Sequence, residues 1–212
     1  MSHRINTLIL AFGFMVGLLG LSMSWPATTV SAAATPKTGD MAPNFTATDI
    51  HGEPFNLEDH KDKIVVLEWT NHECPFVKKH YETNNMQEIQ KTATDKGVAW
   101  ISIVSSAPGN QGYVSAEEAV KIVEEVGANA TTRILDTTGE IGRLYGAKTT
   151  PHMFVINKGV LAYAGAIDDN PSANPDTVEG AENLVLKAID EIKAGEEVSV
   201  ASTQPYGCSV KY

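Results

Sequence analysis

Short apolar runs alternate with segments of helical spacing along residues 44–194, and this alternation most constrains the fold. Lys63–Trp69 (KIVVLEW) and Val98–Ser105 (VAWISIVS) are β-branched apolar runs, typical of strands that are buried inside a sheet. A polar segment with a helical pattern, Pro75–Lys96, separates the two runs. We therefore expect a sheet covered by helices, which is an α/β sandwich.

The remaining elements are shorter and support the same architecture. A turn at His51-Gly52 lies between two strand-like runs, and Lys158-Gly159 joins two further strands as a tight hairpin. Ser115-x-x-Glu118 is a capping-box pattern that begins a helix reaching about Gly127. The other predicted strands and helices are Asn44–Asp49, Pro54–Leu57, Arg133–Leu135, His152–Asn157 and Val160–Gly165, then Glu140–Tyr145 and Val178–Ala194.

The amino-terminal residues 1–34 differ in kind from the rest. Arg4 precedes an almost wholly apolar run from Leu8 to Met23, and the small residues Ala32–Ala34 fit a cleavage site. The run is about 16 residues long, below the roughly 20 that span a bilayer. We predict a signal peptide at 1–34 and a secreted or periplasmic protein with no stable membrane insertion after cleavage; an uncleaved membrane anchor is the alternative. Disulfides persist in such a compartment.

Charge and cysteine content exclude several classes of protein. The chain has 16 Lys+Arg and 26 Asp+Glu, a formal net charge of -10, whereas nucleic-acid binding needs a basic face. Nucleic acid is therefore not an expected partner. Two cysteines are too few for a four-thiolate zinc or iron–sulfur site. They allow one disulfide, or one reactive thiol with a partner, and we expect no bound cofactor.

Cys74 lies where a predicted buried strand passes through a loop into a helix. Pro75 is tolerated in the first helical turn, which places Cys74 at or just before the helix start. Unpaired N–H groups and the positive end of the helix dipole favour a thiolate there. The neighbours in the sequence are polar: Asn71, His72, Glu73, Lys78 and Lys79. They predict an exposed, reactive cysteine rather than a buried structural one.

Four features occur in order over about 115 residues and together resemble one family. They are Gly39-x-x-Ala42-Pro43-x-Phe45 followed by His51-Gly52, the Lys63–Trp69 strand, Cys74-Pro75, and Thr149-Thr150-Pro151. From Gly39 to Ala194 the chain resembles the thioredoxin-fold redoxins, which include thioredoxin-like reductases and alkyl hydroperoxide reductase/thiol-specific antioxidant proteins. The resemblance implies a thioredoxin-like three-layer sandwich with an N-terminal β-hairpin extension. Residues 35–194 would form this domain, and 195–212 a C-terminal tail that carries Cys208.

The resemblance also gives Pro151 a role. X–Pro is the only linkage at which a cis bond is cheap. In this fold a cis-proline loop lies beside the reactive cysteine and offers its backbone to an extended substrate strand. The resemblance therefore implies a cis peptide at Pro151, close to Cys74.

The sequence departs from the thioredoxin pattern at the second cysteine. Thioredoxins have a cysteine three residues after the first, but here that residue is Val77, so Cys74 has no local disulfide partner. Cys208, between Gly207 and Ser209 in the polar tail, is the candidate partner. It would either resolve an intermediate formed at Cys74 or form a static Cys74–Cys208 disulfide that pins the tail.

The sequence also departs from the peroxiredoxin pattern P-x-x-x-(T/S)-x-x-C. The matching positions are Leu67 and Asn71, and Thr70 lies one residue earlier as the candidate hydroxyl for a peroxide. Peroxiredoxins further use an arginine, and after residue 34 the chain has only Arg133 and Arg143, neither of them in a recognised motif.

Metal binding is the competing interpretation. His72, Cys74 and His152 supply imidazole and thiolate, which are ligands of copper and zinc. A thioredoxin-fold copper-binding or chaperone protein is thus one alternative, and a non-catalytic redoxin with a static disulfide is the other.

The preferred hypothesis is an exported thiol-based oxidoreductase with Cys74 as its nucleophile. The reaction would be thiol–disulfide exchange, or peroxide reduction through a Cys74 sulfenic acid. The catalytic candidates are Cys74, Cys208, Thr70 and Pro151. The expected partners are a thiol or disulfide protein, or a peroxide, together with an external thiol that donates electrons.

Overall fold

The computed structural model describes Met1 and residues 34–212. The predicted signal peptide at 1–34 therefore lies almost wholly outside the described residues. Within the described part of the chain, no helix has the length and apolarity needed to cross a membrane.

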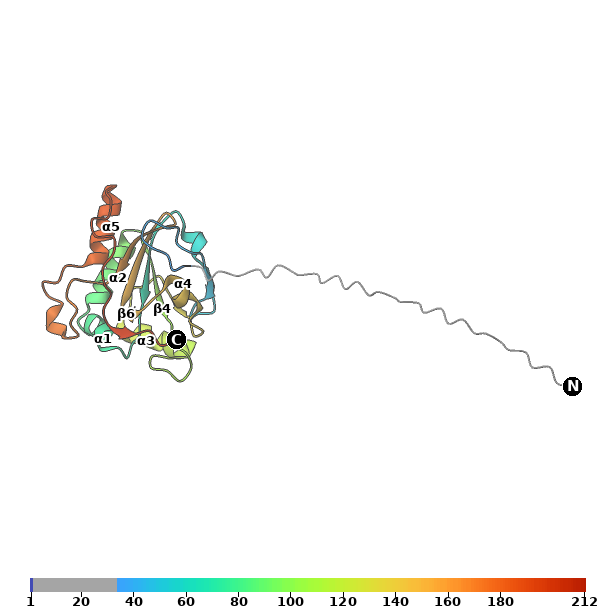
Figure 1. The fold of residues 1–212 in the computed structure, drawn as a ribbon. Coiled ribbons are helices and arrows are strands. Elements are labelled where there is room, and N and C mark those ends of the chain that lie inside the picture. Colours follow the sequence, from blue (N-terminus) through green and yellow to red (C-terminus); the bar gives the residue numbers. More distant parts are fainter. Residues whose placement is uncertain (2–33) are drawn as a thin grey trace. The chain divides into compact units, whose positions relative to one another are not determined.

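A five-stranded mixed sheet forms the middle layer of residues 34–212 (Figure 1). Its strand order is β5-β4-β3-β7-β8. Strands β3 (Ile64–Trp69), β4 (Ala99–Val104) and β5 (Thr132–Leu135) run parallel. Strands β7 (His152–Asn157) and β8 (Val160–Gly165) continue the sheet in antiparallel pairing. The two apolar runs of the sequence therefore form neighbouring inner strands.

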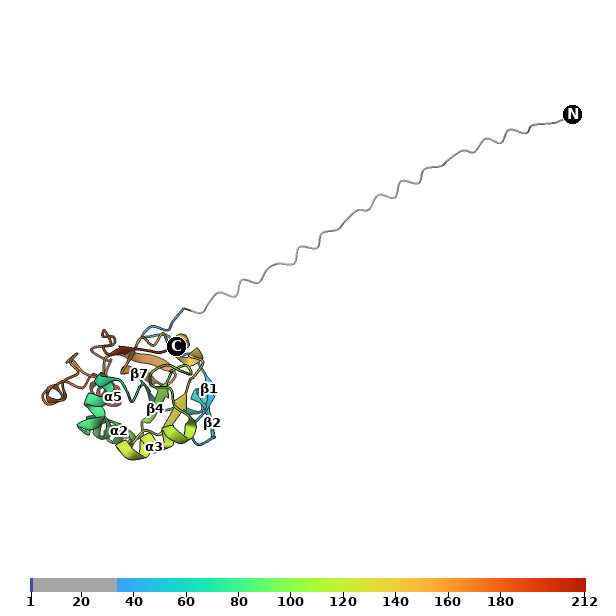
Figure 2. The same cartoon turned by 90° about the horizontal axis from the view of Figure 1, so that it is seen from below.

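Helices and a small hairpin cover the two faces of this sheet. The helices are α1 (Pro75–Glu82), α2 (Asn85–Asp95), α3 (Ala116–Val126), α4 (Glu140–Tyr145) and α5 (Leu184–Ala194). The other elements are β1 (Thr46–Thr48), β2 (Pro54–Asn56), β6 (Thr149–Thr150), β9 (Cys208–Ser209), and the 3₁₀ turns η1 (Leu57–His60) and η2 (Pro175–Thr177). Figure 2 shows α2 and α5 on one side of the sheet and the β1–β2 hairpin on the other.

Each face of the sheet has its own apolar core. On the α4 side, the ring of Trp69 packs against Tyr145 and Phe154, with centroids 5.7 and 5.1 Å apart. On the α2 and α5 side, Trp100 and Met86 are fully buried in the second core. Burying these large side chains is the main favourable contribution to folding. The predicted three-layer α/β sandwich with an N-terminal hairpin is confirmed.

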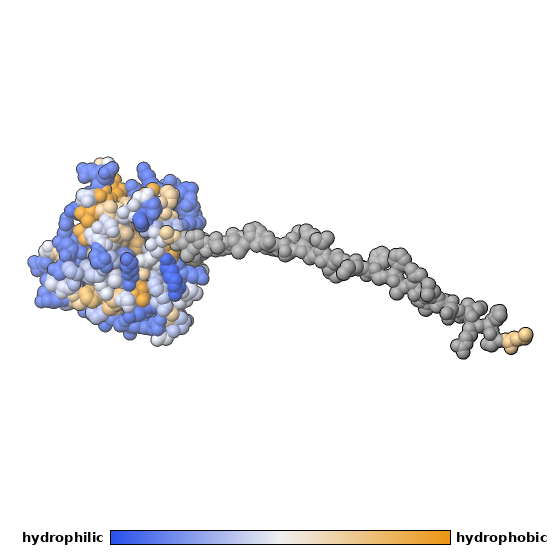
Figure 3. Space-filling model, in the orientation of Figure 1, coloured by the Kyte–Doolittle hydropathy of each residue, from blue (hydrophilic) through white to orange (hydrophobic). Residues whose placement is uncertain are grey.

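Hydrophilic residues predominate on the face of the domain drawn in Figure 3, where apolar residues form only small patches. This agrees with the placement of most large apolar side chains in the two cores.

The predicted helix Pro75–Lys96 is two helices. Asn84, between α1 and α2, has a left-handed backbone with φ 63°. Asparagine tolerates this conformation better than most residues, and the Asn84 side chain donates a 3.1 Å hydrogen bond to Glu88 in the next turn. The polar pattern continues through the break, so the sequence does not reveal it.

The last helix begins later than predicted, at Leu184 rather than Val178. The Asn183 side chain accepts from the Leu186 N–H at 2.8 Å and caps the helix. Gly180, with φ 81°, lies in the loop ahead of it. The apolar residues of this loop follow helical spacing without forming a helix.

Candidate active site

Cys74 is held at the start of α1 by local backbone bonds. It is the residue before the first helical turn, with Pro75 next, as the sequence predicts. Its N–H donates to the carbonyl of Asn71 at 3.0 Å, and its carbonyl accepts from Val77 and Lys78. The cysteine therefore has a fixed position above the end of β3.

The C-terminal tail returns to this helix start. Strand β9 pairs antiparallel with β6, which aligns Cys208 with Thr150 and Ser209 with Thr149. The Sγ atoms of Cys74 and Cys208 lie 2.7 Å apart, and Cys74 Sγ is 3.1 Å from the Thr150 carbonyl oxygen. The Thr150–Pro151 peptide is cis. The fold thus brings together both cysteines and Pro151.

Cys74 is not exposed, contrary to the expectation from its polar neighbours. Its exposed fraction is 0%, and Asn71 and Lys79 are buried as well. The Asn71 side chain forms hydrogen bonds inside the protein. Its Nδ2 donates to the Gln111 carbonyl, and its Oδ1 accepts from the Glu73 N–H. Cys208 is only partly buried, so it is the more accessible of the two sulfurs.

The surroundings shift the pKa values of the two thiols in opposite directions. Burial raises the pKa of Cys74, but hydrogen bonds outweigh it and hold the pKa below its ordinary value. The first of these bonds comes from the Cys208 thiol, and others come from the backbone N–H groups of Cys208 and Val77. Burial, the hydrogen bond with Cys74 and the negative charge of Cys74 raise the pKa of Cys208 to about 11. Cys74 is therefore the more acidic thiol of the pair.

Gly207 allows the tail to approach this closely. Its φ is +134°, and a Cβ at this position would lie 2.7 Å from the Thr150 carbonyl carbon and closer still to its oxygen. No real side chain tolerates such a contact with backbone, so a residue with a Cβ would push β9 away from β6.

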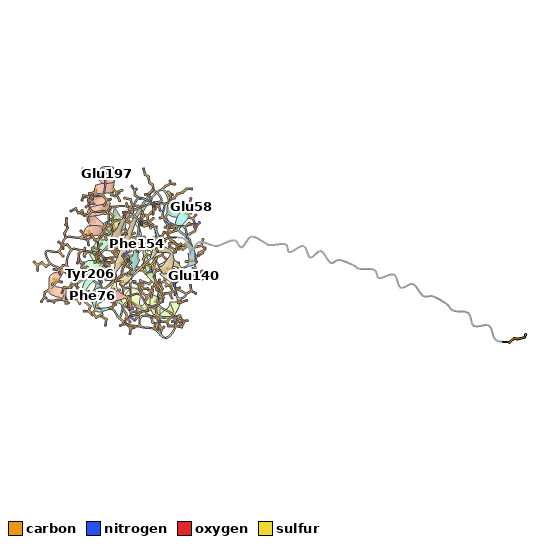
Figure 4. The ribbon with its side chains drawn as sticks, viewed as in Figure 1. Glu58, Phe76, Glu140, Phe154, Glu197 and Tyr206 are labelled. Atoms are coloured by element: carbon orange, nitrogen blue, oxygen red, sulfur yellow. The ribbon has the colours of Figure 1, made fainter. Side chains whose placement is uncertain are left out.

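Tyr206 anchors the tail beside α1. Its phenol donates a hydrogen bond to Asp168, and its ring lies 5.9 Å from the ring of Phe76. Figure 4 labels Tyr206 and Phe76 next to each other. The buried Lys79 ammonium is 3.5 Å from the same Asp168 carboxylate. No local pattern in the sequence indicates this cluster, because its residues are distant from one another in the chain.

Comparison with known proteins places the fold in a family. Residues 38–164 match the AhpC/TSA family. The chain belongs to this family. It is 31% identical over 120 residues to the thiol-disulfide oxidoreductase ResA of Bacillus thuringiensis and that of Bacillus cereus. These matches cover 57% of this chain and 64% of each relative, which is less than two thirds of their length.

Solved structures agree with the AhpC/TSA assignment. An uncharacterized conserved protein from Geobacillus kaustophilus has a TM-score of 0.72 and 27% identity, covering 82% of this chain and 92% of that one. A putative thiol:disulfide interchange protein DsbE from Chlorobium tepidum has a TM-score of 0.50 and 25% identity, covering 60% and 84%. The chain is therefore a thioredoxin-fold redoxin, as its motifs indicate.

Thr70, the candidate peroxide-binding residue, lies apart from the cysteine contacts of this AhpC/TSA protein. It is buried directly after β3, where its N–H donates to the Ile103 carbonyl at 2.9 Å. Its side chain lines a cavity together with His72. Thr150 contacts Cys74 through its carbonyl oxygen, and its own buried hydroxyl has no hydrogen-bond partner among the described residues.

The alternative metal ligands are not gathered into one site. His152 is buried, its Nδ1 accepts from the Lys148 N–H at 3.2 Å, and its ring lies 4.4 Å from that of Phe154. Burial lowers the pKa of His152 to about 3. Within residues 34–212 no three His, Cys, Asp or Glu side chains are close enough to hold a metal ion, so His72, Cys74 and His152 do not form the ligand set of the alternative interpretation.

Proposed function

We propose that the protein is an exported thiol–disulfide oxidoreductase in which Cys74 is the nucleophile and Cys208 resolves the intermediate. The observation that carries the proposal is the 2.7 Å approach of the two sulfurs across the β6–β9 strand pair. The names of the ResA relatives and of the Chlorobium tepidum structure support the reaction class. The pattern of residues 1–34 supports export.

The reaction begins at the Cys74 thiolate. It attacks one sulfur of a substrate disulfide and forms a mixed disulfide, while the other substrate sulfur leaves as a thiolate and takes up a proton. Cys208 then loses its proton and attacks Cys74 Sγ, which releases the second substrate sulfur as a thiol. The substrate gains two electrons and two protons, and the chain retains a Cys74–Cys208 disulfide. An external thiol reduces this disulfide and completes the cycle.

The acidity of Cys208 changes when its attack is needed. In the reduced protein, the negative charge of Cys74 contributes to the raised pKa of Cys208. Once Cys74 is bonded to the substrate, its sulfur carries no charge, and this contribution disappears. The pKa of Cys208 then falls, and the fraction of Cys208 thiolate rises at the stage that requires it.

The tail occupies the place of a substrate. In the thioredoxin-like fold, the strand before the cis-proline offers its backbone to an extended substrate segment, and here β9 pairs with that strand, β6. Because Cys74 is fully buried, an external disulfide reaches it only after β9 leaves. The tail thus alternates between a closed form, in which the cysteines meet, and an open form that admits substrate.

A turnover assay tests this proposal. Purified protein is mixed with a disulfide-bonded peptide and reduced glutathione, and release of the peptide thiols is followed. We expect wild-type turnover and none with Cys74→Ser. Cys208→Ser should release one peptide thiol and hold the other on Cys74 as a mixed disulfide, without forming an internal disulfide. An internal disulfide that glutathione never reduces, with no peptide reduced, would identify a static link instead.

Peroxide reduction is measured in parallel. Consumption of hydrogen peroxide by the reduced protein would assign a peroxiredoxin-like reaction to the same Cys74, through its sulfenic acid. A role for Thr70 then requires that Thr70→Val lose this activity while its peptide reduction is retained.

A further inference from the structure

A cavity of about 410 Å³ lies between α1, α3 and the sheet. Its volume is within the range of small-molecule sites. Half of its lining residues are apolar or aromatic: Val77, Tyr81, Val104, Val114, Ile122 and Val126. Neither cysteine lines it, so it is separate from the disulfide site.

Arg133 on β5 lines the same cavity, although its exposed fraction is only 6%. Its Nε is buried without a hydrogen-bond partner, and no ion pair between described residues involves it. Arginine is always charged and presents five N–H donors. Buried charges in proteins are normally paired, because removing them from water is costly. Arg133 therefore lacks the counterion that its burial calls for.

The nearby carboxylates do not supply that counterion. Glu82 and Glu125 line the cavity, but neither forms an ion pair with Arg133. Glu68 on β3 and Arg133 on β5 both align with Ser102 on β4, the strand between them. The Glu68 carboxylate instead accepts hydrogen bonds from four neutral groups, on Tyr81, Gln90, Trp100 and Ser102.

We propose that this cavity binds a small organic anion whose apolar body fills the apolar space and whose carboxylate or sulfonate pairs with Arg133. A guanidinium matches such oxygens through two parallel hydrogen bonds. Of the two cations that line the cavity, Arg133 is buried and Lys78 is exposed. The two glutamates on the wall offset much of the positive charge, which favours a ligand with a single negative charge. Thr70 and His72, which precede Cys74, also line the cavity, so the ligand lies against the active-site loop. The proposal does not depend on the reaction of Cys74.

Two fluorescent probes test whether Arg133 pairs with an anionic ligand. 1-Anilinonaphthalene-8-sulfonate and N-phenyl-1-naphthylamine share one aromatic body, but only the first carries a sulfonate. We expect the full protein to bind the sulfonate probe more tightly. Arg133→Met should weaken that probe about 10- to 100-fold, the usual effect of losing a charge-assisted hydrogen bond, and leave the neutral probe within about 2-fold. Lys121→Met removes an exposed cation from α3, outside the cavity lining, and should change neither affinity.

A second variant locates the probes. Ile122→Trp fills the cavity from α3 and should abolish binding of both probes, and circular dichroism checks that each variant is folded. Equal wild-type affinity for the two probes would overturn the proposal. So would sulfonate binding that survives Arg133→Met or Ile122→Trp.

Discussion

Replacing Gly207 by alanine should release the tail from the active site. The new Cβ would lie 2.7 Å from the Thr150 carbonyl carbon, and a φ of +134° is itself strained for alanine. Backbone strain of about 1–3 kcal/mol and a weakened β6–β9 hydrogen bond of about 1 kcal/mol together amount to about 2–4 kcal/mol. In the reduced protein, this free energy shifts the tail toward its open form by about 30- to 700-fold.

The alkylation rate of Cys74 measures this opening. Because Cys74 is 0% exposed in the closed form, iodoacetamide reaches it only when the tail is open. Mass spectrometry of the Cys74 peptide after timed labelling of the reduced protein gives the rate at a fixed pH. Gly207→Ala should raise it by the factor above.

Gly195→Ala is the matched control. Gly195 also has a left-handed φ, +79°, but nothing lies within 4 Å of its added Cβ. The control should therefore label Cys74 at nearly the wild-type rate. A wild-type rate in Gly207→Ala would refute the conclusion that the β6–β9 pairing controls access to Cys74.

Two other changes test the tail anchor and the buried histidines. Tyr206→Phe removes the hydroxyl that donates to Asp168 and should speed Cys74 labelling about 10- to 100-fold, the effect of one hydrogen bond to a charged group. The control Tyr113→Phe, at an exposed tyrosine, should leave the labelling rate unchanged. Equal labelling rates in the two variants would exclude a role of Tyr206 in holding the tail. Burial lowers the pKa of His80 to about 4 and of His152 to about 3, so the unfolded chain, with pKa near 6.5, takes up protons first. Their contribution to stability is complete above pH 6.5 and is lost as the pH falls, by about 2 kcal/mol per histidine at pH 5. Urea unfolding at pH 7 and pH 5 checks this, and equal free energies of unfolding would contradict it.

The sequence predicts those features that rest on local patterns. The apolar run Lys63–Trp69 identifies an inner strand because its burial on both faces requires apolar side chains throughout. Pro75 marks the helix start at Cys74 because proline fits the first turn. The cis bond at Pro151 follows from resemblance to the family rather than from local chemistry.

Features that depend on contacts between distant residues are not predictable from the chain alone. The burial of Cys74 and Lys79 arises from the tail and the Asp168 cluster, and their polar neighbours in sequence gave the opposite expectation. The return of the tail depends on one glycine opposite a carbonyl 57 positions earlier (207 − 150). The helix break at Asn84 and the late start of α5 depend on backbone conformations that helical spacing does not encode.

The most direct measurement is the identity of the cysteine that first bonds to a substrate. Reduced protein is mixed with a disulfide-bonded peptide, quenched with acid at intervals and analysed by mass spectrometry. Cys208→Ser should accumulate a stable peptide adduct on Cys74, whereas the wild type should pass through this adduct to a Cys74–Cys208 disulfide. Two results would contradict the proposed division of roles between the two cysteines. One is that Cys74→Ser forms an adduct on Cys208 as fast as the wild type forms its adduct on Cys74. The other is that the wild type never resolves its Cys74 adduct.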